Sequence, residues 1–141
     1  MRKNILLLAL LAVFISTNET QAQNKETTTT PFVWEGANLY FLLTDRFNNG
    51  DSSNDINYNR NKETGKLRGF MGGDVKGITQ KIEEGYFDQL GINAIWMTPL
   101  VEQIHEGTDE GTGYSYGFHG YWTKDWTAFD PNFGTAEEVK N

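Results

Sequence analysis

A stretch of oxygen-bearing side chains from Arg46 to Asn61, RFNNGDSSNDINYNRN, has the residue types to bind a metal ion. Ten of its sixteen residues are Asn, Asp or Ser, which favour turns because their side chains compete with the backbone for hydrogen bonds. Such a stretch is either a solvated loop or a set of oxygen ligands for a hard cation such as Ca²⁺. The EF-hand pattern does not fit, because a loop starting at Asp51 has Ile56 and Lys62 where Gly and Glu are required. The local pattern alone therefore favours the solvated loop.

A second group of candidate functional residues is aromatic. Eight aromatic side chains follow one another closely: Tyr114, Tyr116, Phe118, Tyr121, Trp122, Trp126, Phe129 and Phe133. Most of them are expected in the core, because aromatic rings bury large apolar areas. Rings of this kind also stack on the apolar faces of sugars. Taken alone, His119 in this cluster would be a structural histidine, and His105 receives no functional assignment.

The composition restricts the ligands and partners. The 141 residues include no cysteine and two histidines, which excludes disulfides and cysteine-based zinc sites, so a bound metal would have oxygen ligands. The formal net charge is −7, and it becomes −8 when residues 1–22, which carry Arg2, Lys3 and Glu19, are removed. This acidic balance argues against nucleic acids and anionic membranes as partners.

The N-terminal residues indicate export. Arg2 and Lys3 precede an apolar run from Ile5 to Ile15, and Thr20-Gln21-Ala22 offers small residues where a signal peptidase would cleave. We interpret residues 1–22 as a signal peptide of a secreted or periplasmic protein. A membrane anchor is the alternative, but a span needs about 18–20 apolar residues. No cysteine follows for lipidation, and polar residues 23–31 are interpreted as a flexible linker.

The pattern after the linker predicts a strand, a helix and a second strand. Asn38–Thr44 is a continuous apolar run of strand length, which is typical of a strand buried on both faces of a parallel sheet. Gly77–Leu90 carries apolar residues at every fourth position and predicts an amphipathic helix that Gly91 would end. Ile92–Thr98 predicts the second strand. Because the order is βαβ, the two strands should be parallel.

The C-terminal part predicts a long loop and the start of a second helix. Residues 101–134 show little periodicity, whereas Thr135 and Glu138 have the spacing of a capping box. Because the sequence stops at Asn141, within the first two turns of this helix, it is expected to be the front part of a longer one.

Three motifs together resemble the α-amylase family of glycoside hydrolases. They are YFLLTDRFNNGDSSND, GGDVKGITQKIEEGYFDQLGINAIWMTP and GFHGYWTKDWTAFDPNFGTAEEVK, in the family's order and spacing. The likeness covers Phe32 to Asn141 and is closest in pattern to bacterial calcium-binding α-amylases and cyclodextrin glucanotransferases. It implies an α/β fold, a truncated TIM (β/α)8 barrel, in which residues 32–141 supply the first two strands, the first helix and the start of the second.

The resemblance implies a calcium site in the loop after the first strand. The ligands carried over would be the Gly72 carbonyl and the side chains of Asn49, Asp51, Asn54, Asp55 and Asp74. Six oxygens, three of them from carboxylates, suit Ca²⁺ better than Mg²⁺, because a flexible loop does not enforce octahedral geometry. The family often has Asp where this sequence has Asn49, which would lower the affinity.

The resemblance also implies a sugar-binding motif, HGYW. Tyr121 would be the platform under the sugar at the cleavage point, and His119 would hydrogen-bond that sugar. We expect Trp122, Trp126 and Phe133 to be packing residues. No catalytic residue is predicted, because Asp45, Asp125 and Asp130 match scaffold positions and the family's catalytic carboxylates lie on later strands.

The function expected of the full-length protein is therefore the cleavage or transfer of α-1,4-linked glucans such as starch and maltodextrins, by a retaining mechanism. The 141-residue chain alone should be inactive. A non-catalytic, sugar-binding member of the same family and an unrelated secreted calcium-loop module are the alternatives.

Overall fold

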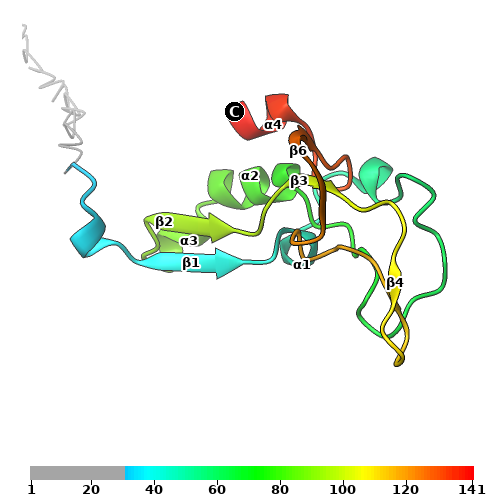
Figure 1. The fold of residues 1–141 in the computed structure, drawn as a ribbon. Helices are drawn as coiled ribbons and strands as arrows, with labels where there is room; N and C mark the ends of the chain where they lie inside the picture. Colours follow the sequence, from blue (N-terminus) through cyan, green and yellow to red (C-terminus); the bar gives the residue numbers. More distant parts are fainter. Residues whose placement is uncertain (1–30) are drawn as a thin grey trace, which may run out of the picture. The chain divides into compact units, whose positions relative to one another are not determined.

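Two parallel strands form the sheet on which the fold is built. The computed structural model describes residues 31–141, so the predicted signal peptide and nearly all of the predicted linker lie outside the described residues. β1 (Leu39–Leu42) pairs in parallel with β2 (Ala94–Met97), with Leu39 opposite Ala94 and Leu42 opposite Met97. Figure 1 shows the two strands side by side with the helical segment alongside. The predicted parallel βαβ unit is confirmed.

The helix predicted as Gly77–Leu90 is two helices. α2 (Val75–Glu83) begins two residues earlier than predicted, because Asp74 caps it, and α3 (Tyr86–Gln89) is a separate short helix. Gly85 separates them with a φ of 71°, a left-handed conformation that glycine adopts without steric cost. The predicted stop is confirmed, since Gly91 has a φ of 69° and its N–H bonds the Asp88 carbonyl.

The break at Gly85 also changes which helix residues are buried. The predicted apolar stripe is buried only at Ile78, whereas Ile82 and Leu90 are 52% and 54% exposed. Phe87 is buried in place of Ile82 and Leu90, because α3 starts in a new helical phase. It packs with Ile78 and Leu42. Burial of each of these side chains stabilises the fold by roughly 1.5–3 kcal/mol. Four rings join this core edge-to-face or stacked: Tyr40, Phe47, Tyr86 and Phe87.

One face of the sheet is uncovered within residues 31–141. Tyr40, Leu42, Ile95 and Met97 face the helices. On the other face Leu39, Phe41 and Trp96 are about half exposed, with the Phe41 and Trp96 rings edge-to-face at 5.7 Å between centroids. The prediction that β1 is buried on both faces is therefore wrong for this part of the chain, because no described element covers that side.

Short helical turns precede and follow β1. The turn η1 (Trp34–Gly36) lies before it, and α1 (Thr44–Phe47) starts where the first strand was predicted to end. The oxygen-rich loop, residues 48–73, follows α1 and contains one 3-10 turn, η2 (Ser52–Asn54).

The segment predicted as an irregular loop, 101–134, contains four strands. β3 (Val101–Gln103) pairs antiparallel with β6 (Thr123–Phe129), and β4 (Thr108–Asp109) pairs antiparallel with β5 (Tyr114–Ser115). The β3–β6 register shifts twice, which explains why no clean alternation is visible in the sequence.

α4 (Ala136–Lys140) follows the strands and confirms the predicted capping box. The Thr135 hydroxyl accepts from the Glu138 N–H at 3.3 Å, and the Glu138 carboxylate accepts from the Thr135 N–H at 2.8 Å. None of the helices described in residues 31–141 has the length and apolar character needed to cross a membrane.

Candidate functional site

Asp74 is the centre to which the oxygen-rich loop attaches. Its carboxylate is fully buried and accepts four hydrogen bonds of 2.6–3.0 Å, from the N–H groups of Gly50, Asp51 and Gly77 and from the Asn54 side-chain amide. The Gly77 bond is the N-cap of α2, which leaves the other three to hold the loop. A residue proposed as a cation ligand is therefore also the residue that attaches the loop to the helix.

A second group of predicted ligands meets at Gly72. The Asn49 side-chain amide donates to Asp55 Oδ1 at 2.8 Å, and a Cβ placed on Gly72 would clash with both side chains. Gly72 has a φ of 89°, a left-handed conformation that favours glycine. The structure thus brings Asn49, Asp55 and Gly72 together.

The remaining two predicted ligands have different surroundings. Asp51 forms an ion pair with Lys76 at 3.0 Å and accepts two bonds from Ser53, and the bonds from Ser53, with Lys76, lower its pKa to about 2. Asn54 Oδ1 is buried and has no hydrogen-bond partner among the described residues. An unpaired buried oxygen, on an amide whose nitrogen bonds the Asp74 carboxylate, fits the ligand chemistry of a hard cation.

The described residues do not gather the carboxylates of this loop into one cluster. Residues 31–141 contain no group of three His, Cys, Asp or Glu side chains placed to hold a metal, so a cation here would also need the amide and carbonyl oxygens. The calcium ligand set stays a prediction.

Asp45 and Arg46, in the turn after β1, hold the far end of the loop. The buried Asp45 carboxylate accepts from the N–H groups of Met71 and Gly72, and burial raises its pKa to about 6 despite those bonds and the neighbouring Arg46. Arg46 donates to the Leu67 and Gly69 carbonyls at 2.9 and 2.8 Å. These contacts fix the return of the loop to the sheet.

The HGYW motif forms a tight turn between β5 and β6. The Tyr121 N–H donates to His119 Nδ1 at 3.0 Å, and the two rings stack with 5.9 Å between centroids. Gly120 has a φ of 86° and lies so close to Pro99 that a Cβ would clash with its carbonyl. The Tyr121 side chain is 58% exposed, so its ring is available to a ligand.

His119 is arranged to donate from its second ring nitrogen. Because Nδ1 accepts the Tyr121 N–H, the proton of the neutral imidazole is on Nε2. Burial lowers the pKa of His119 below its usual value, so the ring is neutral at pH 7.

Gln103 is a positioning residue that the sequence analysis missed. This fully buried side chain in β3 donates to the Gly120 carbonyl at 3.1 Å and accepts from the Trp122 N–H at 2.7 Å. It therefore holds the backbone on both sides of Tyr121. Nothing in the VEQI stretch, where Gln103 follows the charged Glu102, marks this role in the sequence.

The other residues named from the sequence divide into buried and exposed positions. Phe133 is fully buried, as expected of a packing residue, but Trp126 is 76% exposed, so the packing interpretation is wrong for Trp126 in this part of the chain. Asp130 is fully buried, and Asp125 bonds the N–H and hydroxyl of Thr127.

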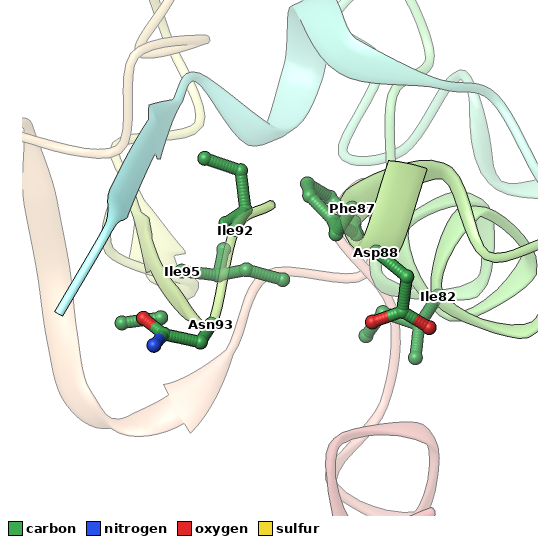
Figure 2. A pocket seen from close by; sticks show the side chains of 7 residues that line it. Ile82, Phe87, Asp88, Ile92, Asn93 and Ile95 are labelled. Carbon is green, nitrogen blue, oxygen red and sulfur yellow. The ribbon is translucent and has the colours of Figure 1, made fainter. Parts of the chain in front are cut away.

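A cavity of about 320 Å³ lies outside this site, between α3 and β2 (Figure 2). Its lining is mostly apolar and includes Ile82, Phe87, Ile92 and Ile95. None of its lining residues belongs to the predicted site.

Comparison with known proteins shows the same family across most of the chain. The family model for the alpha-amylase catalytic domain matches residues 41–141. The periplasmic alpha-amylase of Escherichia coli is 44% identical over 117 residues, which is 80% of this chain and 17% of the relative. The cyclomaltodextrin glucanotransferase of Klebsiella oxytoca is 33% identical over 131 residues, 92% of this chain and 19% of the relative.

Solved structures give the same result. The three-domain cyclomaltodextrin glucanotransferase CldA aligns with a TM-score of 0.62 at 36% identity over 72% of this chain and 21% of its own. AmyP in complex with maltose aligns with a TM-score of 0.55 at 34% identity over 74% of this chain and 19% of its own. The chain thus spans about a fifth of the length of such relatives. It belongs to the alpha-amylase catalytic-domain family.

Proposed function

We propose that residues 32–141 are the N-terminal part of the catalytic domain of a secreted or periplasmic enzyme that hydrolyses or transfers α-1,4-glucans. The observation that carries the proposal is the exposed Tyr121 ring in the HGYW turn. Gln103 bonds the backbone of the residues before and after Tyr121. The relatives support the substrate class, since they are named alpha-amylases and cyclomaltodextrin glucanotransferases and AmyP is bound to maltose.

In this proposal the Tyr121 ring stacks on the apolar face of a glucose unit and the neutral His119 donates its Nε2–H to a sugar hydroxyl. Hydrolysis by a retaining mechanism needs two carboxyl groups about 5–5.5 Å apart. Asp45 and Asp130 are buried and already hydrogen-bonded, which leaves them unsuited to that role. We therefore place the catalytic carboxylates outside residues 32–141.

The chain spans about a fifth of the length of its relatives, which supports a larger (β/α)8 barrel as the working unit. Two parallel strands leave Leu39, Phe41 and Trp96 about half exposed, on a face that a closed barrel would bury. In such a barrel the oxygen-rich loop and the HGYW turn both follow the C-terminal ends of strands, where TIM-barrel active sites lie.

We further propose that Ca²⁺ binds in the oxygen-rich loop. Asn49, Asp51, Asn54, Asp55, Gly72 and Asp74 would supply the oxygens. The cation would contribute charge that orders the loop, not a reacting group. The unpaired Asn54 Oδ1 and the contact of Asn49 and Asp55 at Gly72 support this position.

The test is Tyr121→Ala in the full-length protein. We expect kcat/KM on maltodextrin to fall at least about tenfold, or about 1.4 kcal/mol of transition-state binding. Trp126→Ala is the control, because it removes an exposed aromatic ring from the neighbouring strand β6 and should leave kcat/KM unchanged. Wild-type kinetics in Tyr121→Ala, with an inactive but folded Trp122→Ala, would show that the wrong ring was chosen. Maltodextrin binding without release of reducing ends from the wild type would favour the non-catalytic alternative.

A further inference from the structure

A buried ion pair and its hydrogen bonds join the oxygen-rich loop to two distant parts of the chain, β3 and the end of β6. Arg60 lies in that loop, and Asp130 follows β6; both side chains are fully buried. Their contact is bidentate, at 2.8 Å between Nη1 and Oδ1 and 2.7 Å between Nη2 and Oδ2. Arg60 also donates to the Gln103 carbonyl at 3.0 Å, and the Gln103 N–H donates to Asp130 at 2.9 Å. The loop, β3 and the end of β6 therefore share one set of hydrogen bonds.

Aromatic rings and backbone groups complete the surroundings of the pair. The Arg60 guanidinium lies 4.8 Å from the Phe70 ring centroid and 5.0 Å from that of Tyr58. The Asp130 carboxylate accepts a fourth bond, from the Asn132 N–H at 3.0 Å. Because both side chains are fully buried, removal of Arg60 would leave the Asp130 carboxylate as a buried charge without its partner.

Asn132 links the ion pair to two of the candidate cation ligands by hydrogen bonds. Its Oδ1 accepts from Arg60 Nη1 at 2.7 Å, and its Nδ2 donates to the carbonyls of Asn54 and Asp55 at 3.1 and 2.6 Å. Arginine can only donate, so Arg60 fixes which end of the Asn132 amide is the acceptor and points the NH₂ group at those carbonyls.

The two residues that receive these bonds are two of the six predicted ligands. Asn54 and Asp55 have no regular secondary structure beyond the short turn η2 to hold them. The side chains of these residues can meet a cation only if the backbone that carries them is fixed. We propose that Arg60 and Asn132 are positioning residues that fix this backbone and thereby set the affinity of the loop for Ca²⁺, an inference that rests on the calcium site proposed above.

The experiment uses the full-length protein freed of divalent cations. The dissociation constant for Ca²⁺ is measured by calorimetry, and the melting temperature is measured separately without cation. Asn132→Asp keeps an acceptor for Arg60 but removes both donors to the carbonyls. Loss of two hydrogen bonds is expected to weaken Ca²⁺ binding about tenfold or more. Arg60→Lys should weaken it at least as much, because a single ammonium group cannot form the bidentate pair and bond Asn132 as well.

Lys62→Ala is the matched control. Lys62 lies two residues from Arg60 in the same loop and forms an ion pair of similar length, 2.8 Å to Glu106, but that pair is solvent-exposed. Within residues 31–141 the side chain of Lys62 bonds Glu106 and Tyr114, and not Asn54 or Asp55. Its Ca²⁺ affinity should stay within about twofold of the wild type, since exposed pairs contribute little.

The outcomes separate this inference from the calcium site itself. Weaker binding in Asn132→Asp and Arg60→Lys, with wild-type binding in Lys62→Ala, supports the positioning role. A lower cation-free melting temperature with unchanged Ca²⁺ affinity overturns it and leaves a purely structural ion pair. No Ca²⁺ binding by the wild type refutes the cation site, and the positioning role with it. If Asn132→Asp does not fold, Asn132→Ser, which keeps a donor but shortens its reach, replaces it in the same comparison.

Discussion

The buried carboxyl group of Asp45 should make stability fall as the pH rises. Burial raises its pKa from 3.8 to about 6, against the lowering effect of the Met71 and Gly72 N–H groups and of Arg46. Between these two pH values the folded protein holds more protons at this site than the unfolded chain does. The free energy of unfolding therefore decreases with pH across that window. At about 1.4 kcal/mol per pKa unit, the full loss at pH 7 is about 3 kcal/mol.

The assay compares the full-length protein with Asp45→Asn, which cannot ionise, at a series of pH values in chelator. At pH 4 the side chain of Asp45 is protonated, so the two proteins differ only by the substitution itself. From pH 4 to pH 7 the melting temperature of Asp45→Asn should rise relative to the wild type by about 6 °C, at roughly 2 °C per kcal/mol. Added Ca²⁺ should move this window to lower pH if a cation binds beside Gly72.

Asp125→Asn is the control of opposite sign. Its bonds with Thr127 lower the pKa of Asp125, so the wild type should gain on that variant as the pH rises towards the usual pKa of an aspartate, and the difference should then stay constant up to pH 7. A difference between Asp45→Asn and wild type that does not change with pH would refute the burial argument. A change in the opposite direction would show that Arg46 and the backbone N–H groups outweigh burial.

Three further predictions concern the cation, the HGYW turn and the isolated segment. Chelation should lower the melting temperature of the full-length protein. Asp74→Ala should lower it at least as much, because it also removes the bonds that attach the loop to α2, and chelation should then have little further effect. An unchanged melting curve of the wild type in excess chelator would contradict the calcium site. Gln103→Leu should cost about 2–3 kcal/mol of stability, because it leaves the Trp122 N–H and the Gly120 carbonyl unpaired, and it should lower kcat/KM with Tyr121 intact; wild-type kinetics in a folded variant would refute its positioning role. Residues 23–141 alone should release no reducing sugar from starch and form no stable monomer, since the edges and one apolar face of the β1–β2 sheet are uncovered; a monomeric, cooperatively melting, starch-cleaving product on size exclusion and circular dichroism would overturn this.

Local patterns predicted the βαβ unit because each of its signals acts over a few residues. Two apolar runs, the fourfold apolar spacing between them and Gly91 specify the strands, the helix and its end without reference to distant contacts. The break at Gly85 was missed because glycine is tolerated inside an apolar helical pattern, and only the φ of 71° reveals the change of phase that buries Phe87. β3 and β6 were missed because a twice-shifted register removes the alternation that marks a strand.

The candidate site shows a different limit, because its organisation depends on contacts between residues far apart in the chain. The resemblance selected His119 and Tyr121, but nothing local indicates that Gln103, sixteen and eighteen residues earlier, holds their turn. Motif residues therefore point to the side chains that face a ligand more readily than to the residues that hold those side chains in place.

The turn after β1 joins the two parts of the site, and its two charged residues do so in different directions. Asp45 bonds the backbone at Met71 and Gly72, where the oxygen-rich loop returns to the sheet. Arg46, the next residue, lies with its guanidinium 3.8 Å from the centre of the Phe118 ring, which directly precedes the HGYW motif. Because both side chains project from the single turn of α1, a shift of that turn moves the loop and the HGYW turn together. An ordered loop, with or without a cation, therefore also helps to hold the Tyr121 ring in place.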